Sequence, residues 1–292
     1  LNFGCPHGMT ERGMGAAVGQ DPEIACMVVE WVMEKATIPV ITKLTPNVHS
    51  VVPTGRSVVK AGSNGLSLIN TIQSVTGVDL DSFVPNPYVG GKSVFGGYCG
   101  PAVKPIALKM LTTIAQDDLT SKVPISGIGG VSTWKDAVEF MLLGASNVQV
   151  CTAAMHHGFR IVEDMAEGLN NWMNEKGFKK LTDFIGKSVP TVTHWEDLDI
   201  NYHHVAQINQ EKCIHCGLCY IACEDTSHQS INLEKGMPYN TYTIKEEECV
   251  GCNLCQLVCP VDNCITMEER RVAPEYINWV EWQKRGLPLN DH

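Results

Sequence analysis

Eight cysteines in the C-terminal third of the chain have the spacing of iron–sulfur ligands. The run Cys213-x2-Cys216-x2-Cys219-x3-Cys223 recurs as Cys249-x2-Cys252-x2-Cys255-x3-Cys259, with each cysteine displaced by 36 residues. In such a pair of runs, three thiolates hold one [4Fe–4S] cluster and the fourth ligates the other cluster. We therefore expect two clusters, one held by Cys213, Cys216, Cys219 and Cys259 and the other by Cys249, Cys252, Cys255 and Cys223.

Disulfides and zinc are the alternative uses of clustered cysteines. A reducing compartment disfavours disulfides, and zinc does not explain eight cysteines in two ferredoxin-spaced runs. Cys264 lies outside both runs, and we expect it to pack as a small buried residue. Because iron–sulfur clusters carry single electrons, this region is predicted to transfer electrons between two other redox centres.

Two predicted strand ends indicate a phosphate site. Gly129-Gly130 and Cys151-Thr152 each follow a strand-like segment and precede a helical one. Backbone N–H groups and a hydroxyl at two successive strand ends match the phosphate site formed after the last two strands of a TIM barrel. Flavin mononucleotide (FMN) has one phosphate to anchor there, and it exchanges single electrons with clusters while passing hydride to an organic substrate.

Lys43 ends an earlier predicted strand, where it could hold a flavin oxygen or N1. The alternative is a solvated lysine at a strand end. A nicotinamide dinucleotide site is not expected in this chain, because no G-x-G-x-x-G follows a strand; Gly13-Met14-Gly15 lacks the third glycine. We therefore expect NADH to act through a partner.

The segment from Asn2 to Gly8 is expected at the carboxyl end of another strand, where barrel enzymes carry their chemistry. Cys5 could exchange one proton while a flavin moves a hydride. Asn2, and Asn70-Thr71 at a further strand end, could bind the imide or amide edge of a ring. Taken singly, each has a simpler interpretation, a small buried cysteine or a turn-forming asparagine.

The elements that must position these residues alternate between strand and helix. Residues 39–44, 65–70, 124–128 and 147–152 are strand-like, and helices are expected over 22–32, 54–61, 102–116, 132–144 and 158–176. Asp21 and Ser132 are expected as N-caps. The first helix has a predicted apolar stripe formed by Ile24, Met27, Val28, Trp31 and Val32. This alternation predicts a parallel α/β fold.

The phosphate site favours a barrel over an open sheet. If residues 124–128 and 147–152 are the seventh and eighth barrel strands, then residues 1–3 end the fourth strand. The fold class expected is thus α/β, the C-terminal part (about strands 4 to 8) of a TIM (β/α)8 barrel that binds FMN. A small α+β ferredoxin-like domain with two [4Fe–4S] clusters follows. On this interpretation the chain is a fragment of a longer protein; the alternative is a complete five-stranded sheet.

Composition supports two domains and excludes some partners. We predict the barrel over residues 1–178, a linker over 179–204, the ferredoxin-like domain over 205–270 and a tail over 271–292. The net charge of −10 argues against nucleic acid and anionic membranes as partners. No apolar run approaches the roughly 18 to 20 residues that cross a bilayer, and no signal peptide opens the chain. A cytoplasmic, soluble protein is expected.

The sequence resembles the dihydropyrimidine dehydrogenase family, and most closely its bacterial NAD-dependent form. The segments that carry the resemblance are Asn2-Phe3-Gly4-Cys5-Pro6-His7-Gly8-Met9, Gly19-Gln20-Asp21-Pro22-Glu23, Lys43-Leu44-Thr45-Pro46-Asn47, Asn70-Thr71, residues 96–100, Gly129-Gly130, Val150-Cys151 and the two cysteine runs. The resemblance implies that Cys5 is the general acid. It implies substrate contacts from Asn2, Phe3, Gly4, Asn70 and Thr71, and flavin contacts from Lys43, Gly100, Ile128, Gly129, Gly130, Cys151 and Thr152.

The same resemblance implies a reaction. Electrons from NADH would enter a partner subunit that binds FAD and NAD, cross the two clusters and reduce FMN in the barrel. Hydride from FMN and a proton from Cys5 would then reduce the 5,6 double bond of uracil or thymine, a step of pyrimidine catabolism. Two alternatives remain. One is an FMN oxidoreductase like dihydroorotate dehydrogenase, and the other is a non-catalytic iron–sulfur electron-transfer subunit.

Overall fold

A computed structural model describes residues 1–5, 13–226, 228–271 and 277–286. The chain divides into two compact units, Leu1–Val192 and Thr193–His292. Among the described residues, no helix is long and apolar enough to span a bilayer. Each unit is described by itself.

A four-stranded parallel sheet forms the centre of the first unit. Its strands lie in the order β1 (Ile41–Lys43), β2 (Gly65–Leu68), β9 (Ile125–Ile128) and β10 (Asn147–Gln149). Asn2 extends it by one parallel bridge to Lys43. The predicted parallel sheet is therefore confirmed. The strands are shorter than predicted, because the residues after each strand leave the ladder to form loops at its carboxyl end.

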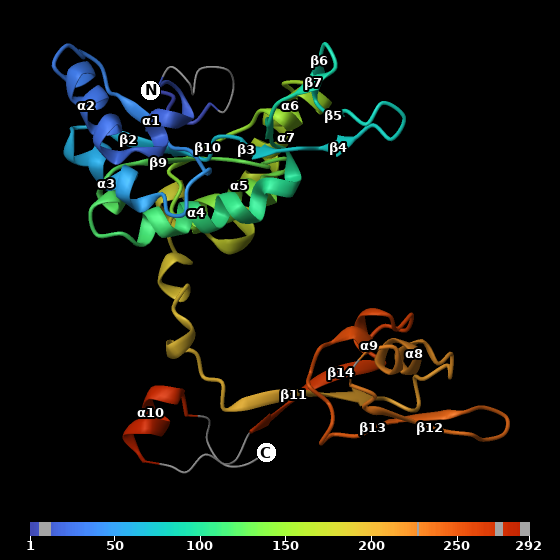
Figure 1. Ribbon diagram of the computed structural model, residues 1–292. Helices are drawn as coiled ribbons and strands as arrows, with labels where there is room; N and C mark the ends of the chain where they lie inside the picture. The colour runs from blue at the N-terminus through green and yellow to red at the C-terminus, as the bar shows by residue number, and fades with distance from the viewer. Residues whose placement is uncertain (6–12, 227, 272–276, 287–292) are drawn as a thin grey trace. The chain divides into compact units, whose positions relative to one another are not determined.

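Helices alternate with these strands along the chain. They are α1 (Ala16–Gln20), α2 (Pro22–Met33), α3 (Val52–Lys60), α4 (Lys104–Gln116), α5 (Trp134–Leu142), α6 (Thr152–His157) and α7 (Ile161–Lys176), with short 3-10 helices at Pro101–Val103 and Thr120–Lys122. In Figure 1, α4 and α5 lie along one face of the sheet. Leu66, Leu68, Leu111 and Phe140 are fully buried between these layers. The apolar face of the sheet is thus the one that the helices cover.

Two details of the helices differ from the prediction. The N-cap of α5 is Thr133 rather than Ser132, because Thr133 forms a capping box with Asp136. The predicted apolar stripe of α2 is wrong in part: Val28 packs against the core, but Trp31 is 58% exposed, and the buried residues are Ala25 and Val29. Small side chains on that face let α2 pack closely on α3. Asp21 caps α2 as predicted, accepting hydrogen bonds from two backbone N–H groups.

An antiparallel excursion, which the sequence analysis missed, interrupts the alternation between β2 and α4. It consists of three two-stranded pairs: β3 (Ile72–Ser74) with β8 (Gly96–Tyr98), β4 (Gly77–Val78) with β5 (Pro85–Asn86), and β6 (Tyr88–Val89) with β7 (Lys92–Ser93). Figure 1 shows the two outer pairs projecting away from the sheet. Strands of two or three residues are too short to give a period-2 pattern.

The segment after α7 packs on the first unit before the chain leaves it. Phe184 is fully buried, and its ring contacts Trp172 and Phe178. This segment contains two short 3-10 helices, Leu181–Asp183 before Phe184 and Val189–Thr191 after it. Aromatic packing therefore fixes the first part of the segment that was expected to be a linker.

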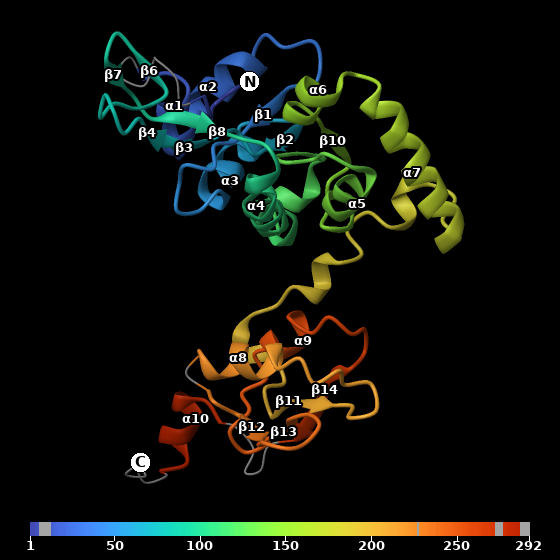
Figure 2. The same ribbon diagram turned by 90° about the vertical axis from the view of Figure 1, so that its right-hand side faces the viewer.

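The second unit contains two antiparallel strand pairs and two short helices that overlap the cysteine runs. β11 (Tyr202–Ile208) pairs with β14 (Ile265–Arg271), and β12 (Ile231–Glu234) pairs with β13 (Thr241–Ile244). Helices α8 (Leu218–Glu224) and α9 (Leu254–Leu257) lie side by side, as both views show (Figures 1 and 2). A 3-10 helix at Trp195–Asp197 and α10 (Trp279–Lys284) complete the unit. Cys264 is buried in its core, as predicted.

Candidate functional site

A cavity of about 130 Å³ lies at the carboxyl ends of the four parallel strands. It gathers nine residues that the sequence analysis singled out: Lys43, Asn70, Thr71, Gly100, Ile128, Gly129, Gly130, Cys151 and Thr152. These residues come from segments more than 100 positions apart in the chain. Because the carboxyl ends of parallel strands meet at one edge of the sheet, this is where ligands of α/β proteins bind. Their individual roles stay predictions.

The glycines beside this cavity let two loops approach each other closely. Gly130 has φ +79°, and a Cβ there would lie 2.9 Å from the Gly100 carbonyl oxygen and 2.9 Å from Lys104 Cβ. Both the left-handed backbone and the close approach require glycine. A bare backbone at two neighbouring loops is what a phosphate needs to reach the N–H groups. The residues present therefore fit FMN with its phosphate at this end of the cavity.

An ion pair joins the two loops that carry these glycines. Lys104 Nζ, at the start of α4, lies 2.6 Å from Asp136 and 2.8 Å from Glu139 on α5. Asp136 also accepts hydrogen bonds from the backbone N–H groups of Ser132 and Thr133. Burial raises the pKa of Asp136, but the hydrogen bonds from Lys104, Ser132 and Thr133 outweigh it and hold the pKa below its usual value. The carboxylate is thus charged at neutral pH, and it fixes the loop after β9.

The substrate-binding candidates Asn2, Asn70 and Thr71 are close together. Asn70 Nδ2 donates a hydrogen bond of 2.7 Å to Asn2 Oδ1, which also accepts one from the Gly4 N–H. Thr71 lines the cavity, and its buried hydroxyl has no hydrogen-bond partner in the described part of the chain. A buried hydroxyl without a partner is costly, and a polar ligand would satisfy it.

Phe3, Gly4 and Cys5 do not line this cavity. Phe3 is buried in the core, and a Cβ at Gly4 would lie 2.5 Å from Asn70 Cβ, so this position excludes a side chain unless Asn70 moves. Cys5 is partly buried, and its carbonyl accepts a hydrogen bond of 3.0 Å from the Ala16 N–H. The rest of that motif, residues 6–9, lies outside the described residues.

The sequence analysis missed a row of polar side chains on the sheet face opposite α4 and α5. In the strand register Lys43 pairs with Ser67, Ser67 with Ser126, and Ser126 with Asn147. The amide of Gln149, which lines the cavity, donates hydrogen bonds of 2.8 Å to Ser67 and 2.7 Å to Ser126. Alternation of serine with leucine in β2 could have indicated this row, since side chains of a strand alternate between faces. Lys43 and Gln149 therefore bring this polar row to the cavity, whose lining is otherwise mostly apolar.

The second unit has two cavities lined by the cysteines of the two runs. One is lined by Cys213, Cys216, Cys219 and Cys259. The other is lined by Cys223, Cys249, Cys252 and Cys255. None of these eight cysteines forms a disulfide. Within the described residues, no three potential ligands converge as a single metal ion requires. Cys264, which lies outside both runs, also lines the first cavity. Four cysteines of the runs around each of two separate spaces match the donor set of a cluster with several metal ions.

Burial affects the protonation of two of these thiols. Burial, together with a smaller effect of the neighbouring thiols, raises the pKa of Cys219 and that of Cys255 to about 11. Without a bound cation these residues are therefore neutral thiols at pH 7. Thiolates are the ligands of iron, so cluster binding must displace these protons.

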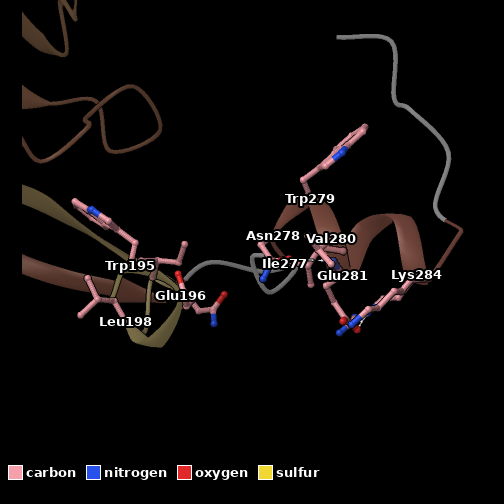
Figure 3. Close-up of a pocket in the computed structure, with 12 residues that line it drawn as sticks. Trp195, Glu196, Leu198, Ile277, Asn278, Trp279, Val280, Glu281 and Lys284 are labelled. Carbon is pink, nitrogen blue, oxygen red and sulfur yellow. Dashed lines mark hydrogen bonds and ion pairs between the residues drawn. The ribbon is translucent and has the colours of Figure 1, made fainter. Parts of the chain in front are cut away.

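The cavity with the largest volume, about 870 Å³, lies elsewhere in the second unit. It is lined by residues 195–201 and by α10, and the rings of Trp195 and Trp279 point outward rather than toward each other (Figure 3). Trp279 stacks on Trp282 with ring centres 4.9 Å apart. No thiol or glycine loop contributes to this groove, so it offers no counterpart of the chemistry above.

Comparison with known proteins agrees with this division of the chain. Residues 1–173 match the family model described as dihydroorotate dehydrogenase, and residues 206–267 match a 4Fe-4S dicluster domain.

Three curated relatives are representative. The NAD-dependent dihydropyrimidine dehydrogenase subunit PreA of Escherichia coli K12 is 42% identical over 79% of this chain and 56% of the relative. The chloroplastic dihydropyrimidine dehydrogenase (NADP(+)) of Arabidopsis thaliana is 44% identical over 68% of this chain and 47% of the relative. The dihydroorotate dehydrogenase B (NAD(+)) catalytic subunit of Pyrococcus furiosus is 43% identical over 64% of this chain and 58% of the relative.

The chain spans about half the length of the curated relatives that it matches. The match to the family model covers more than half of the chain, and its parallel sheet carries the glycine-lined cavity at the strand ends. The chain therefore belongs to the dihydroorotate dehydrogenase family, and a 4Fe-4S dicluster domain follows the part that matches this family.

Proposed function

We propose that this chain belongs to an enzyme that reduces the 5,6 double bond of uracil or thymine to the 5,6-dihydropyrimidine. The observation that carries the proposal is the combination of one glycine-lined cavity at the sheet edge with two four-cysteine cavities in the same chain. When electrons for a hydride transfer come from a separate donor, the enzyme needs a site where hydride is transferred and clusters that carry single electrons to it.

The comparisons favour pyrimidine reduction over dihydroorotate oxidation. The similarity to PreA extends over 230 residues, beyond the 173 that match the family model, whereas the similarity to the Pyrococcus catalytic subunit extends over 188. The matches to the two dihydropyrimidine dehydrogenases, over 230 and 201 residues, are thus longer than the match to the dihydroorotate dehydrogenase subunit. The partner we propose is a subunit that binds FAD and NAD and passes electrons from NADH to the two clusters.

The residues around the cavity have separate proposed tasks. The backbone at Gly100, Gly129, Gly130, Cys151 and Thr152 would hold the flavin phosphate, Ile128 would pack against the flavin, and Lys43 would stabilise negative charge on its ring. When bound, FMN supplies the hydride for C6 of the pyrimidine and accepts single electrons. Asn2, Asn70 and Thr71 would orient the pyrimidine through its imide edge, and Phe3 and Gly4 would shape the same pocket.

Cys5 would complete the reaction by donating its Sγ proton to C5 of the pyrimidine. The hydrogen bond from Ala16 to the Cys5 carbonyl fixes the backbone of this residue against α1. A general acid must be held within hydrogen-bond reach of the atom that it protonates. The proposal thus gives Cys5 a catalytic role and the backbone contact a positioning role.

Substitution of Cys5 tests this assignment. In the complete enzyme with its electron-donor subunit, Cys5→Ala should bind uracil but reduce it about a hundredfold or more slowly, because general-acid catalysis is lost. Stopped-flow spectroscopy of flavin reoxidation by uracil measures the step. Cys26→Ala is the control, since Cys26 lies on α2, outside the segment from Asn2 to Gly8 that carries Cys5. Equal reoxidation rates in Cys5→Ala and the wild type would disprove the role of Cys5.

A second candidate is oxidation of dihydroorotate, which the family model and the Pyrococcus relative favour. The same purified enzyme distinguishes the two reactions. Flavin bleaching by dihydroorotate, without reoxidation by uracil, would support this candidate and contradict ours. Absence of bound flavin, together with a full complement of iron, would instead indicate an electron-transfer subunit without catalysis.

A further inference from the structure

The two cysteine runs differ at the position after the second cysteine. The first run has Gly217 and the second has Asn253. Both residues have left-handed backbones, with φ +78° and +67°, and both precede a short helix, α8 or α9. The backbone of the repeat is therefore the same at this position, and only the side chain differs.

The surroundings explain why the first run has glycine. A Cβ at Gly217 would lie 2.7 Å from the hydroxyl oxygen of Tyr242, a buried residue of β13. A side chain is therefore excluded there. The second run accommodates one, and Asn253 lines the cavity formed by Cys223, Cys249, Cys252 and Cys255.

The amide of Asn253 is not satisfied by the protein. Its Oδ1 is buried and has no hydrogen-bond partner within the described part of the chain. Leaving such an atom unpaired carries the cost of removing it from water without a replacement hydrogen bond. Glycine would provide the same left-handed backbone without this cost, as Gly217 does. Backbone conformation alone therefore does not account for the asparagine.

The two ends of an asparagine amide have nearly the same shape, and a half turn about χ2 exchanges the oxygen and the NH2 group. Thiolate and sulfide sulfurs accept hydrogen bonds and donate none. Next to a cluster, the NH2 group is consequently the end of the amide that finds a partner. No comparable side chain exists at Gly217 beside the other four cysteines.

We propose that Asn253 donates an N–H hydrogen bond to a sulfur of the cluster held by Cys223, Cys249, Cys252 and Cys255, and thereby makes that cluster easier to reduce than the other. A hydrogen bond to sulfur stabilises the extra negative charge of the reduced state and raises the reduction potential. The inference rests on the proposed cluster sites. It implies that a single electron resides mainly on this cluster rather than on the other.

Asn253→Gly tests the proposal, because it keeps the left-handed backbone of the repeat and removes only the amide. The measurement is a redox titration of the full chain, with both clusters assembled anaerobically, followed by EPR. We expect the midpoint potential of the cluster beside residue 253 to become more negative and that of the other cluster to stay unchanged. In D2O, pulsed EPR of the reduced wild type should show one exchangeable deuteron coupling that Asn253→Gly lacks.

Asn263→Gly is the matched control. Asn263 also has a left-handed backbone, with φ +54°, but it lines neither cysteine cavity. This variant should leave both potentials unchanged. A second variant, Asn253→Asp, keeps the shape of the side chain but has no N–H donor when it is ionised, so it should also lower one potential.

The outcomes are distinguishable. About eight irons per chain with both potentials unchanged in Asn253→Gly and Asn253→Asp would overturn the role of Asn253 and leave the cluster sites intact. A shift in Asn263→Gly of the same size would overturn it as well. A wild-type chain that binds no iron under any assembly condition would instead overturn the cluster sites themselves.

Discussion

The cavity of the first unit and the two cysteine cavities of the second are built in opposite ways. The sheet-edge cavity collects residues from Lys43 to Ala153, one or a few from each strand end. Each cysteine cavity takes three ligand candidates from seven consecutive residues and a fourth from the other run. The first depends on long-range packing, whereas the second depends mainly on local spacing.

This difference bears on how each site tolerates change. Residues of the sheet-edge cavity are held by neighbours that are themselves distant in sequence, such as Gly130 against Gly100 and Lys104. In the cysteine cavities, the one distant member is the fourth cysteine, Cys259 or Cys223. Variants that remove a contact between residues distant in sequence should therefore affect the two kinds of site differently.

The largest expected effect is that of Cys259→Ala. Because Cys259 lines the cavity of the first run, the variant should lose the cluster of that run and keep the other. The iron content would fall from about eight to about four per chain. Iron and sulfide analysis with EPR of the reduced protein measures this.

Cys264→Ala is the control for that variant, since Cys264 lines the same cavity but lies outside both runs. It should retain all the iron. If Cys259→Ala keeps its full iron content, the exchange of the fourth ligand between the runs is wrong.

The next effect concerns the glycine loops. Gly130→Ala should weaken FMN binding about tenfold or more, because the new Cβ would enter the space between Gly100 and Lys104. Titration of flavin fluorescence quenching gives the dissociation constant. Gly158→Ala is a matched control: it has a similar φ of +80° but nothing within 4 Å of its Cβ. An equal loss of FMN affinity in both variants would mean that backbone strain causes the effect, and not the close approach of Gly130 to Gly100 and Lys104.

The smallest effect is expected for Lys104→Met. Because Lys104 is 26% exposed and Asp136 13%, loss of the ion pair should lower the free energy of unfolding by about 1 kcal/mol. Urea titration measures this, and Lys109→Met, an exposed lysine of the same helix, should have little effect.

The effect of Lys104→Met should also depend on pH. The folded-state pKa of Asp136 is lowered, so the ion pair contributes stability above the unfolded-state pKa and loses it as the pH falls through the folded-state value. The difference between variant and wild type should therefore shrink below about pH 4. A difference that is constant down to pH 2 would contradict the charge interaction.

Part of the fold could be predicted from the sequence. The strands of the sheet have buried leucines and isoleucines bounded by glycine and asparagine, and they occur where they were predicted. The stripe of α2 was mispredicted in part, because hydrophobicity alone does not tell which face packs; Ala25 and Val29 are the buried residues of this helix, which packs on α3. The excursion of residues 72–98 was missed because its strands have two or three residues each.

The candidate sites divide in the same way. The spacing of the cysteines predicts two groups of four, and the same groups line the two cavities, while their binding of clusters stays a prediction. Three features of the first unit were not predicted: the polar row with Gln149, the unpaired hydroxyl of Thr71 and the ion pair between Lys104 and Asp136. Each depends on which strand or helix lies beside which.

By itself, the sequence determined the cysteine pattern, the alternation of strands with helices and the glycines at two strand ends. These features reside in short segments whose local geometry follows from spacing and residue type. Only the tertiary structure decided that nine predicted residues surround one cavity, and that Tyr242 excludes a side chain at Gly217 while Asn253 remains unpaired. The physical reason is that close packing between residues distant in sequence sets which side chains fit and which polar atoms find partners.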